Sequence, residues 1–387
     1  MTRKEHGYTL VELIVVMAIF IIVIIITTSA FNSLLGTSSK TSKSAETQIT
    51  DIIGMEALRY DIKHAGYGLP YVFPTAIDYN EAADVGNAPV PGVNASTYND
   101  ADNPPRPFRL GNNVGINGSD YFVVKSTMVS GSTTATKWNY VTTGGDPKVW
   151  SEAARNLVTG DRVVVVDPAP NADPDEQRQL IVSGASFFAT VGANLPGFYP
   201  ADSSKTYMIF AVANGVDLKM PFNRADYYIR RPGDISQRCA PGTGVLYKAV
   251  LSQNANENFS EIPLFDCVAD VQVVLSLASQ APDNNAIDSH ADGAGNNIEA
   301  LSLYQLASRT KEVRLYILTH EGGRDPFYNY PNNRINVGED FGGGVLGGVW
   351  THDGALEGSK NMATTFGADW RNYRWKVYTM VVVPSNL

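Results

Sequence analysis

Oxygen-bearing side chains between residues 288 and 299 have a spacing that could bind calcium. The donors of this pattern are Asp288, Asp292, Asn296 and Glu299. They follow the loop D-x-[DN]-x-[DN]-G-x5-E except at its third position, where His290 replaces an oxygen donor. Calcium takes about six to eight oxygen ligands, and the closing glutamate binds through both carboxylate oxygens. Calcium is therefore the one cofactor considered, against the competing interpretation of a solvated turn, which the Asp-rich and Asn-rich composition favours.

The other polar residues do not assemble into a catalytic set. The 5 histidines are scattered, and none forms the i, i+4 pair of a zinc-protease helix. Gly342 to Gly347 match G-x-G-x-x-G, but no βαβ pattern surrounds them, so a flexible loop is predicted. The 30 basic and 39 acidic residues give a net charge of −9, the wrong sign for binding nucleic acid. We therefore expect neither an enzyme nor a nucleic-acid partner.

An uninterrupted apolar run lies close to the N-terminus. Residues 13–26 are all apolar, and the segment 8–31 carries a single charge, Glu12. At about 1.5 Å per residue this segment would form a helix about 36 Å long, enough to cross the hydrocarbon layer of a membrane. Arg3 and Lys4 precede the run, so the positive-inside bias favours a cytoplasmic N-terminus. The rest of the chain is then expected outside the cytoplasm.

The leader in front of this run has a distinctive pattern. Residues 4–13 read KEHGYTLVEL, in which charged residues precede Gly7, the aromatic Tyr8 follows, and Glu12 lies five residues beyond the glycine. This pattern resembles the class III signal of type IV prepilins and pseudopilins. The resemblance implies that prepilin peptidase removes residues 1–7 by cutting after Gly7 and methylates the new amino group of Tyr8.

Glu12 is an acid inside an apolar segment, and such an acid needs a partner. A carboxylate near the end of an apolar helix costs about 3 kcal/mol on insertion scales, so it indicates a functional site. The resemblance implies that its partner is the N-terminal amine of a neighbouring subunit, and that Glu12 and Thr9 serve filament assembly. The alternative is that Glu12 only reaches the membrane interface of a plain anchor.

A second helical segment follows the apolar run. Apolar residues recur every three or four positions from Ile49 to Ala65, which predicts an amphipathic stalk helix within residues 32–69. The expected inward face consists of Ile49, Ile52, Met55, Leu58, Ile62 and Ala65. The sequence Gly66-Tyr67-Gly68-Leu69-Pro70 then ends the helix.

Residues 70–387 have the texture of a β-rich globular head with long loops. The predicted strands are 121–125, 162–167, 206–213, 244–251, 268–277, 312–319 and 373–383. The predicted polar or glycine-rich loops are 78–120, 282–297 and 321–349, of which the first is interpreted as a solvated insertion. The fold class is therefore α+β, with a long N-terminal helix packed on this head. The sequence leaves open whether the head contains an inserted subdomain.

The stalk exit narrows the resemblance. Residues 58–68 read LRYDIKHAGYG, which is similar to the L-x-x-D-I-R-x-A-G-Y-x-G signature of PilW-like minor pilins, with Lys63 in place of the usual arginine. Later segments similar to that family follow in the same order: 117–120, 160–162, 263–277, 313–315 and 374–379. Together these segments span nearly the whole chain, while the large loops leave the head surface unassigned.

Cys239 and Cys267 are too few for a zinc site or an iron–sulfur cluster made by thiolates of this chain alone. A disulfide or two free thiols remain. The disulfide is favoured because the domain is expected to meet an oxidising compartment, where closing this loop would contribute about 3–4 kcal/mol.

The resulting functional prediction is a minor type IV pilin that primes pilus assembly and lies at or near the pilus tip. The resemblance implies as partners other minor and major pilins, prepilin peptidase and the inner-membrane assembly platform. Before assembly the chain would cross the inner membrane once with its head in the periplasm, and it would then enter the fibre on the cell surface. The alternatives are a type II secretion pseudopilin of the J type, a pilus-borne adhesin using Phe327, Tyr328 and Tyr330, or a membrane-anchored periplasmic enzyme or binding protein whose N-terminus only mimics the signal.

Overall fold

The computed structural model describes residues 9–83, 90–100, 103–170, 172–173, 176–254, 258–279 and 286–387. Within these ranges the side chains at 29, 32–50 and 296 are not described. The chain divides into an N-terminal unit, Met1–Ile49, and a large unit, Thr50–Leu387. Gly7 and Tyr8 lie outside the described residues.

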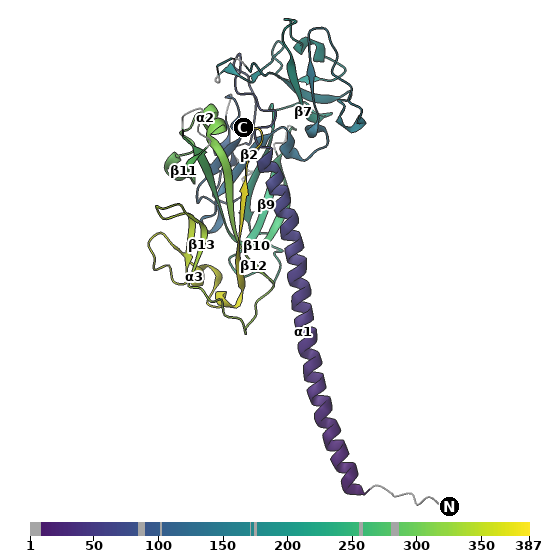
Figure 1. Ribbon diagram of the computed structural model, residues 1–387, viewed down its shortest axis with the longest axis vertical. Coiled ribbons are helices and arrows are strands. Elements are labelled where there is room, and N and C mark those ends of the chain that lie inside the picture. Colours follow the sequence, from purple (N-terminus) through teal and green to yellow (C-terminus); the bar gives the residue numbers. More distant parts are fainter. Residues whose placement is uncertain are drawn as a thin grey trace, which may run out of the picture. The chain divides into compact units, whose positions relative to one another are not determined.

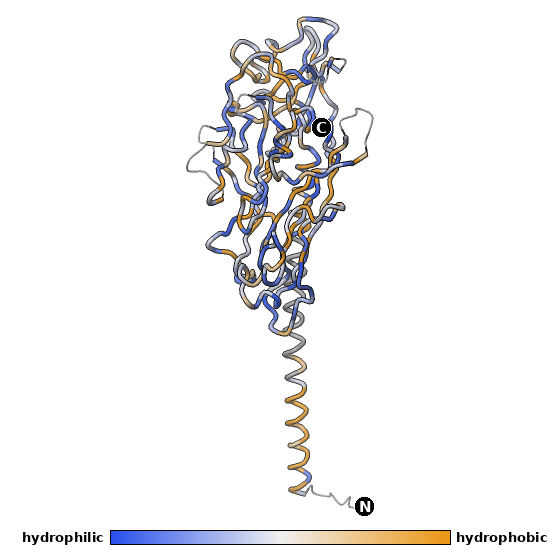
Figure 2. The backbone as a smooth tube through the Cα atoms, turned by 90° about the vertical axis from the view of Figure 1, so that its left-hand side faces the viewer, coloured by the Kyte–Doolittle hydropathy of each residue, from blue (hydrophilic) through white to orange (hydrophobic). Residues whose placement is uncertain are grey.

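Helix α1 covers Leu10–Lys63 and thus enters the large unit with its last turns. Figure 2 shows that its first half is apolar and that this character fades toward the middle of the helix. The helix ends because the backbone at Gly66 and Gly68 has φ angles of +79° and +71°, which glycine adopts without steric penalty. The predicted end near residue 65 is therefore close to the observed one.

The inward face of the last turns of α1 differs from the predicted face. Leu58 and Ile62 are buried as predicted, whereas Ile52 is 56% exposed. Asp51 and Gly54 face inward instead. A Cβ atom at Gly54 would lie 2.4 Å from the carbonyl oxygen of Leu264, so the glycine lets a strand approach the helix backbone.

The large unit is built around an eight-stranded antiparallel sheet, which together with α1 confirms the α+β class (Figure 1). Its strands follow the order β1-β2-β8-β9-β10-β12-β16, and β11 pairs with the end of β10. Their bounds are β1 Phe108–Gly111, β2 Tyr121–Ser126, β8 Asn223–Arg230, β9 Gly244–Leu251, β10 Phe259–Ala278, β11 Ile287–Ala291, β12 Thr310–Glu321 and β16 Arg374–Val382. One face of this sheet packs on Leu58 and Ile62 of α1 in the main hydrophobic core.

A second sheet is inserted between two neighbouring strands of the main sheet. Strands β2 and β8 pair directly, with Ser126 opposite Asn223, yet about a hundred residues separate them. That segment forms a five-stranded sheet in the order β3-β7-β4-β5, with β6 paired to β4. The bounds are β3 Trp138–Val141, β4 Asp161–Asp167, β5 Gln179–Leu180, β6 Ala189–Thr190 and β7 Tyr207–Asn214. We call residues 131–220 the inserted subdomain; Figure 1 places it beyond one end of the main sheet.

A third, small sheet lies toward the opposite end of the large unit (Figure 1). It contains β13 Arg334–Asp340, β14 Val345–Thr351 and β15 Lys360–Asn361. The large unit also contains two short helices, α2 Leu303–Arg309 and α3 Met362–Phe366. Val337, Trp350 and Trp375 pack together between this sheet and the main sheet.

Each of the seven predicted strands corresponds to an observed strand, but the three predicted loops were wrong in part. Strand β11 lies within 282–297, and β13 and β14 lie within 321–349. Residues 341–344 turn this hairpin, where Asp340 Oδ1 accepts the N–H groups of Gly342 and Gly344 at 2.9 and 3.1 Å, and Gly347 already lies in β14. Glycine-rich and polar composition predicted loops where strand pairing and side-chain hydrogen bonds form a hairpin.

The segment 78–120 is likewise not simply a solvated insertion. It contains strand β1, and Val90, Tyr98 and Phe108 are buried. Its acidic residues Glu81 and Asp100 are buried as well, because Lys125 Nζ lies 2.7 and 2.5 Å from their carboxylates. Charged residues can be buried where they are paired, so a polar composition did not imply exposure to solvent.

Candidate functional site

Thr9 and Glu12 form a reciprocal capping arrangement at the start of α1. The N–H group of Thr9 and its hydroxyl donate to Glu12 Oε2 at 2.9 and 3.0 Å. The N–H group of Glu12 donates in return to Thr9 Oγ1 at 3.3 Å. This is the capping-box geometry, in which the side chains at the N-cap and third helical positions satisfy two free backbone N–H groups. The T-x-x-E spacing of Thr9 and Glu12 is the local signal for this role, which is additional to the one predicted in filament assembly.

The apolar helix that carries Glu12 is exposed along its described side chains. Leu10–Thr28 is long and apolar enough to cross a membrane. The large apolar side chains of Leu10 to Ile26 are between 48% and 75% exposed. Such a surface is unstable in water, so lipid or the apolar helices of other subunits must cover it.

Comparison with protein families identified one match in this region. Residues 2–28 match the model described as the prokaryotic N-terminal methylation motif. At its N-terminus the chain is type IV pilin-like. The motif and the apolar helix fit an anchor in the inner membrane, processing by prepilin peptidase and assembly with other pilins. They indicate a structural protein rather than an enzyme. Neither the curated proteins nor the solved structures that were compared gave a match.

Beyond this pilin-like N-terminus, the stalk-exit signature is used to attach α1 to the main sheet. Asp61 Oδ2 lies 2.6 Å from Nζ of Lys248 on β9 and accepts a hydrogen bond from the hydroxyl of Tyr227 on β8. Burial raises the pKa of the Asp61 carboxyl, although the ammonium of Lys248 opposes this shift. The signature aspartate is thus a structural anchor between helix and sheet.

The glycines of the signature let the chain turn against the C-terminus. The N–H of Gly66 donates to the carbonyl of Lys125 at 3.0 Å, and its own carbonyl accepts from Arg178 at 2.9 Å. A Cβ atom at Gly66 would lie 2.7 Å from the side chain of Leu387. The same arginine donates to the carbonyl of Asn386 at 3.1 Å, so one guanidinium joins the helix exit to the end of the chain.

The segments 117–120 and 263–277 meet at strand β10 of the main sheet. The carboxylate of Asp120 accepts the N–H groups of Asn113 and Val273 at 2.9 and 2.8 Å. Burial raises the pKa of Asp120 to about 8. Asp270 accepts from Trp350 and Lys360, each at 2.7 Å. Every one of these groups is engaged in holding loops to strands, so the segments have a structural role.

A buried charge cluster lies beside these segments, and the sequence analysis did not predict it. Arg224 Nε donates to Asp226 at 2.7 Å, and its NH1 group lies 3.0 Å from Glu81. Glu81 also pairs with Lys125. Burial raises the pKa of Tyr121, whose hydroxyl donates to Asp226 at 2.5 Å. The residues of this charge cluster come from positions far apart in the chain, so no local sequence pattern predicts that they lie together.

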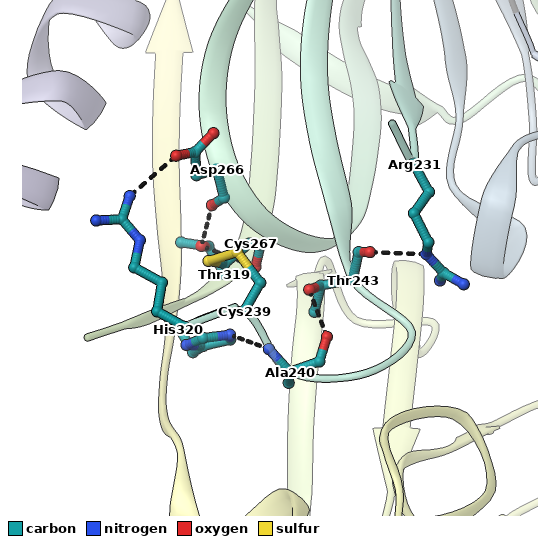
Figure 3. The surroundings of a disulfide bond; sticks show 9 residues. Arg231, Cys239, Ala240, Thr243, Asp266, Cys267, Thr319 and His320 are labelled. Carbon is teal, nitrogen blue, oxygen red and sulfur yellow. Dashed lines mark hydrogen bonds and ion pairs between the residues drawn. A yellow bond between two sulfur atoms is a disulfide. The ribbon is translucent and has the colours of Figure 1, made fainter. Parts of the chain in front are cut away.

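Cys239 and Cys267 are joined by a disulfide, with their Cα atoms 4.8 Å apart (Figure 3). The bond ties the loop before β9 to β10 at a shift in strand register, where Cys267 has a φ of +56°. Next to it the N–H of Ala240 donates to His320 Nε2 at 2.8 Å. Burial lowers the pKa of His320 to about 4, so the imidazole is neutral and can accept this bond.

The proposed calcium donors are not brought together among the described side chains. Asp288 lies in strand β11, and Asp292 Oδ1 accepts the N–H of Ala294 at 3.0 Å. The carboxylate of Glu299 is bound by Arg106 and Arg109 at 3.2 and 3.0 Å. The side chain of Asn296 is outside the description. Among the described residues no group of three or more His, Cys, Asp or Glu side chains could hold a metal ion. Calcium binding stays a prediction.

Proposed function

We propose that this protein is a minor type IV pilin that primes pilus assembly and lies at or near the pilus tip. The observation that carries the proposal is the methylation motif at residues 2–28, which continues into an exposed apolar helix bearing a single acid, Glu12. Lipid alone could cover an apolar helix. A carboxylate five residues after the cleavage position is stable in such surroundings only if a positively charged group pairs with it.

The proposed assembly step is a charge pairing. Cleavage after Gly7 exposes the amine of Tyr8, and the amine of one subunit pairs with the Glu12 carboxylate of its neighbour. Within one chain the capping bonds from Thr9 satisfy hydrogen-bonding capacity but leave the negative charge uncompensated. A cation from another subunit compensates that charge, so the pairing fixes the axial register of the helices while their aliphatic side chains pack.

The large unit would pack laterally on other minor pilins and so start the fibre. Its described polar clusters hold strands, loops and α1 together, which suits a unit under mechanical load. A type II secretion pseudopilin of the J type would use the same N-terminal physics. An adhesin would use the fibre only as a carrier.

Deletion of the gene tests the proposal, with complementation by the native chain as the control. Loss of surface pili with normal protein secretion is the expected result. Normal pili combined with defective secretion would assign the protein to a secretion system. Normal pili combined with poor attachment would assign it to adhesion, and both of these outcomes would contradict a priming role.

A further inference from the structure

Two of the 5 tryptophans of the chain are not used in its hydrophobic core. Trp350, Trp370 and Trp375 are at most 6% exposed. Trp138 is 37% exposed and Trp150 is only half-buried, and both lie in the inserted subdomain. Tryptophan is the side chain with the most apolar area to bury, so two partly exposed tryptophans in one place need an explanation beyond folding.

The two rings lie together on the outer face of strand β3. This strand is at the edge of the inserted sheet, and its residues Asn139 and Val141 point inward and are buried. Trp138 and Tyr140 therefore share the outer face. The ring of Trp150 lies 5.2 Å from that of Trp138 and 6.4 Å from that of Tyr140, measured between centroids. We call these three residues the aromatic platform.

Two asparagines hold the segment that carries Trp150. Asn139 donates to the carbonyl of Lys148 at 2.8 Å and accepts the Lys148 N–H at 2.9 Å. Asn156 accepts the N–H of Trp150 at 2.7 Å and donates to its carbonyl at 3.0 Å. The indole N–H of Trp150 donates to the carbonyl of Trp138 at 3.3 Å. The paired hydrogen bonds of Asn139 and Asn156 thus fix the backbone that carries the Trp150 ring, although this ring adds little to the hydrophobic core. The platform is therefore preorganised for a ligand.

We infer that the aromatic platform binds a neutral polysaccharide through stacking of pyranose rings on its indoles. Indole faces match the apolar C–H faces of a sugar ring, and the polar groups around them can hydrogen-bond to the hydroxyls at its edge. Lys148, whose ammonium lies 4.7 Å from the centre of the Trp150 ring, and the exposed ion pair of Glu152 with Arg155, which are 2.8 Å apart, are such groups.

Charge and size disfavour the other possible occupants. Single-stranded nucleic acid also stacks on aromatic rings, but it requires a positive groove, and here the exposed carboxylates of Asp146 and Glu152 balance Lys148 and Arg155 in a chain of net charge −9. A stable protein interface buries about 800 Å² on each partner, far more than three partly exposed rings provide. A sugar chain needs contact with only a few rings. This binding would be a second activity, separate from the proposed role in assembly.

The test uses the full chain in a detergent without a sugar head group. Cellohexaose and chitohexaose, which are β-1,4-linked hexamers of glucose and N-acetylglucosamine, are titrated while tryptophan fluorescence and heat are recorded. We expect saturable binding of at least one hexamer, weakened at least about tenfold by Trp138→Ala and by Trp150→Ala. Tyr304→Ala removes an aromatic ring that is 36% exposed on helix α2, and it should leave binding unchanged. If an alanine variant does not fold, as judged by loss of the native near-ultraviolet circular dichroism, the corresponding variant Trp138→Phe or Trp150→Phe is tested in its place. These variants should also weaken binding.

The inference is overturned if the native chain binds neither hexamer at concentrations up to about 10 mM. Binding that both tryptophan variants retain would place the sugar elsewhere on the protein and would also overturn it. The same holds if a single-stranded oligonucleotide binds the platform in place of the hexamers. Tryptophan variants that fail to enter the fibre, with no sugar binding by the native chain, would assign the platform to a subunit contact. Each of these results leaves the assembly proposal standing, because that proposal depends on Glu12.

Discussion

Asp61 in the last turn of α1 and Lys248 in strand β9 form a buried ion pair, with Oδ2 and Nζ 2.6 Å apart and side chains only 3% and 10% exposed. The pair joins the helix that carries the prepilin-type N-terminus to the middle of the main sheet. A filament subunit is held by its N-terminal helix, so force on the large unit must pass through contacts of this kind. Asp61 and Lys248 are therefore expected to contribute strongly to stability.

Replacing Asp61 by Ala should destabilise the large unit by about 3–5 kcal/mol, because the Lys248 ammonium would stay buried without its partner. The measurement is denaturant unfolding of the full chain, followed by near-ultraviolet circular dichroism. Glu56→Gln is the matched control, since it breaks the exposed pair of Glu56 with Arg59 on the same helix and should change stability by less than about 0.5 kcal/mol. Equal effects of the two substitutions would contradict the assigned role of Asp61.

The disulfide between Cys239 and Cys267 closes a loop of 28 residues. Replacing both cysteines by Ser should lower the free energy of unfolding by about 3–4 kcal/mol, because the unfolded chain gains conformational freedom. Native protein that has not been reduced should offer no thiol for alkylation, and reduction should slow its migration in a denaturing gel. Two alkylatable thiols in the native protein would contradict the disulfide.

Asp51 gives the large unit a specific pH dependence. Burial raises the pKa of this carboxyl to about 6, while the hydroxyl of Tyr378 donates to it at 3.2 Å. The folded state therefore favours the protonated acid, and this contribution to stability is lost as the pH rises from about 4 through about 6. Asp51→Asn should be more stable than the native chain at pH 7 by about 1 kcal/mol, a value reduced to allow for solvent screening, and the gain should vanish near pH 4.

Unfolding of both proteins across this pH range checks the Asp51 prediction. The control is Asp78→Asn, a change at an exposed position, which should leave the pH profile unaltered. The same pH profile for native protein and Asp51→Asn would show that this carboxyl ionises normally in the fold.

Substitutions at Thr9 and Glu12 separate local capping from pairing between subunits. Thr9→Ala removes the hydroxyl bonds to Glu12 but keeps the carboxylate, so its incorporation into pili should fall by no more than about fivefold, which corresponds to about 1 kcal/mol for the loss of one helix cap. Glu12→Ala removes the charge and should reduce incorporation at least about tenfold in competition with native protein. Immunoblots of sheared pili give the ratio of the two chains. Equal losses for both variants would mean that Glu12 acts only as a cap.

The sequence predicted those parts of the fold that depend on local patterns. The valines of β4, residues 267–278 of β10 and residues 315–320 of β12 form runs that are buried without interruption, and such apolar runs predicted strands. The inward face of α1 was predicted less well, since Gly54 admits a strand that spacing alone does not reveal. The pairing of Glu81 and Asp100 with Lys125 was out of reach, because long-range contacts decide whether a carboxylate is buried.

In the candidate site, too, local patterns were predictable from the sequence and long-range contacts were not. The prepilin-type signal is a local pattern, and comparison with the methylation motif supports it at residues 2–28. Trp138 and Trp150 became a platform only when the fold placed them on one outer face. Calcium binding stays a prediction, but among the described side chains the carboxylate of Glu299 is bound by two arginines that are about 190 residues away in the chain, which the local pattern could not reveal.

The most direct test of the central claim is mass spectrometry of the N-terminus of the protein isolated from cells. The account predicts that the mature chain begins at Tyr8 and that its amino group carries one methyl group. Detection of residues 1–7 on protein taken from assembled fibres would contradict it.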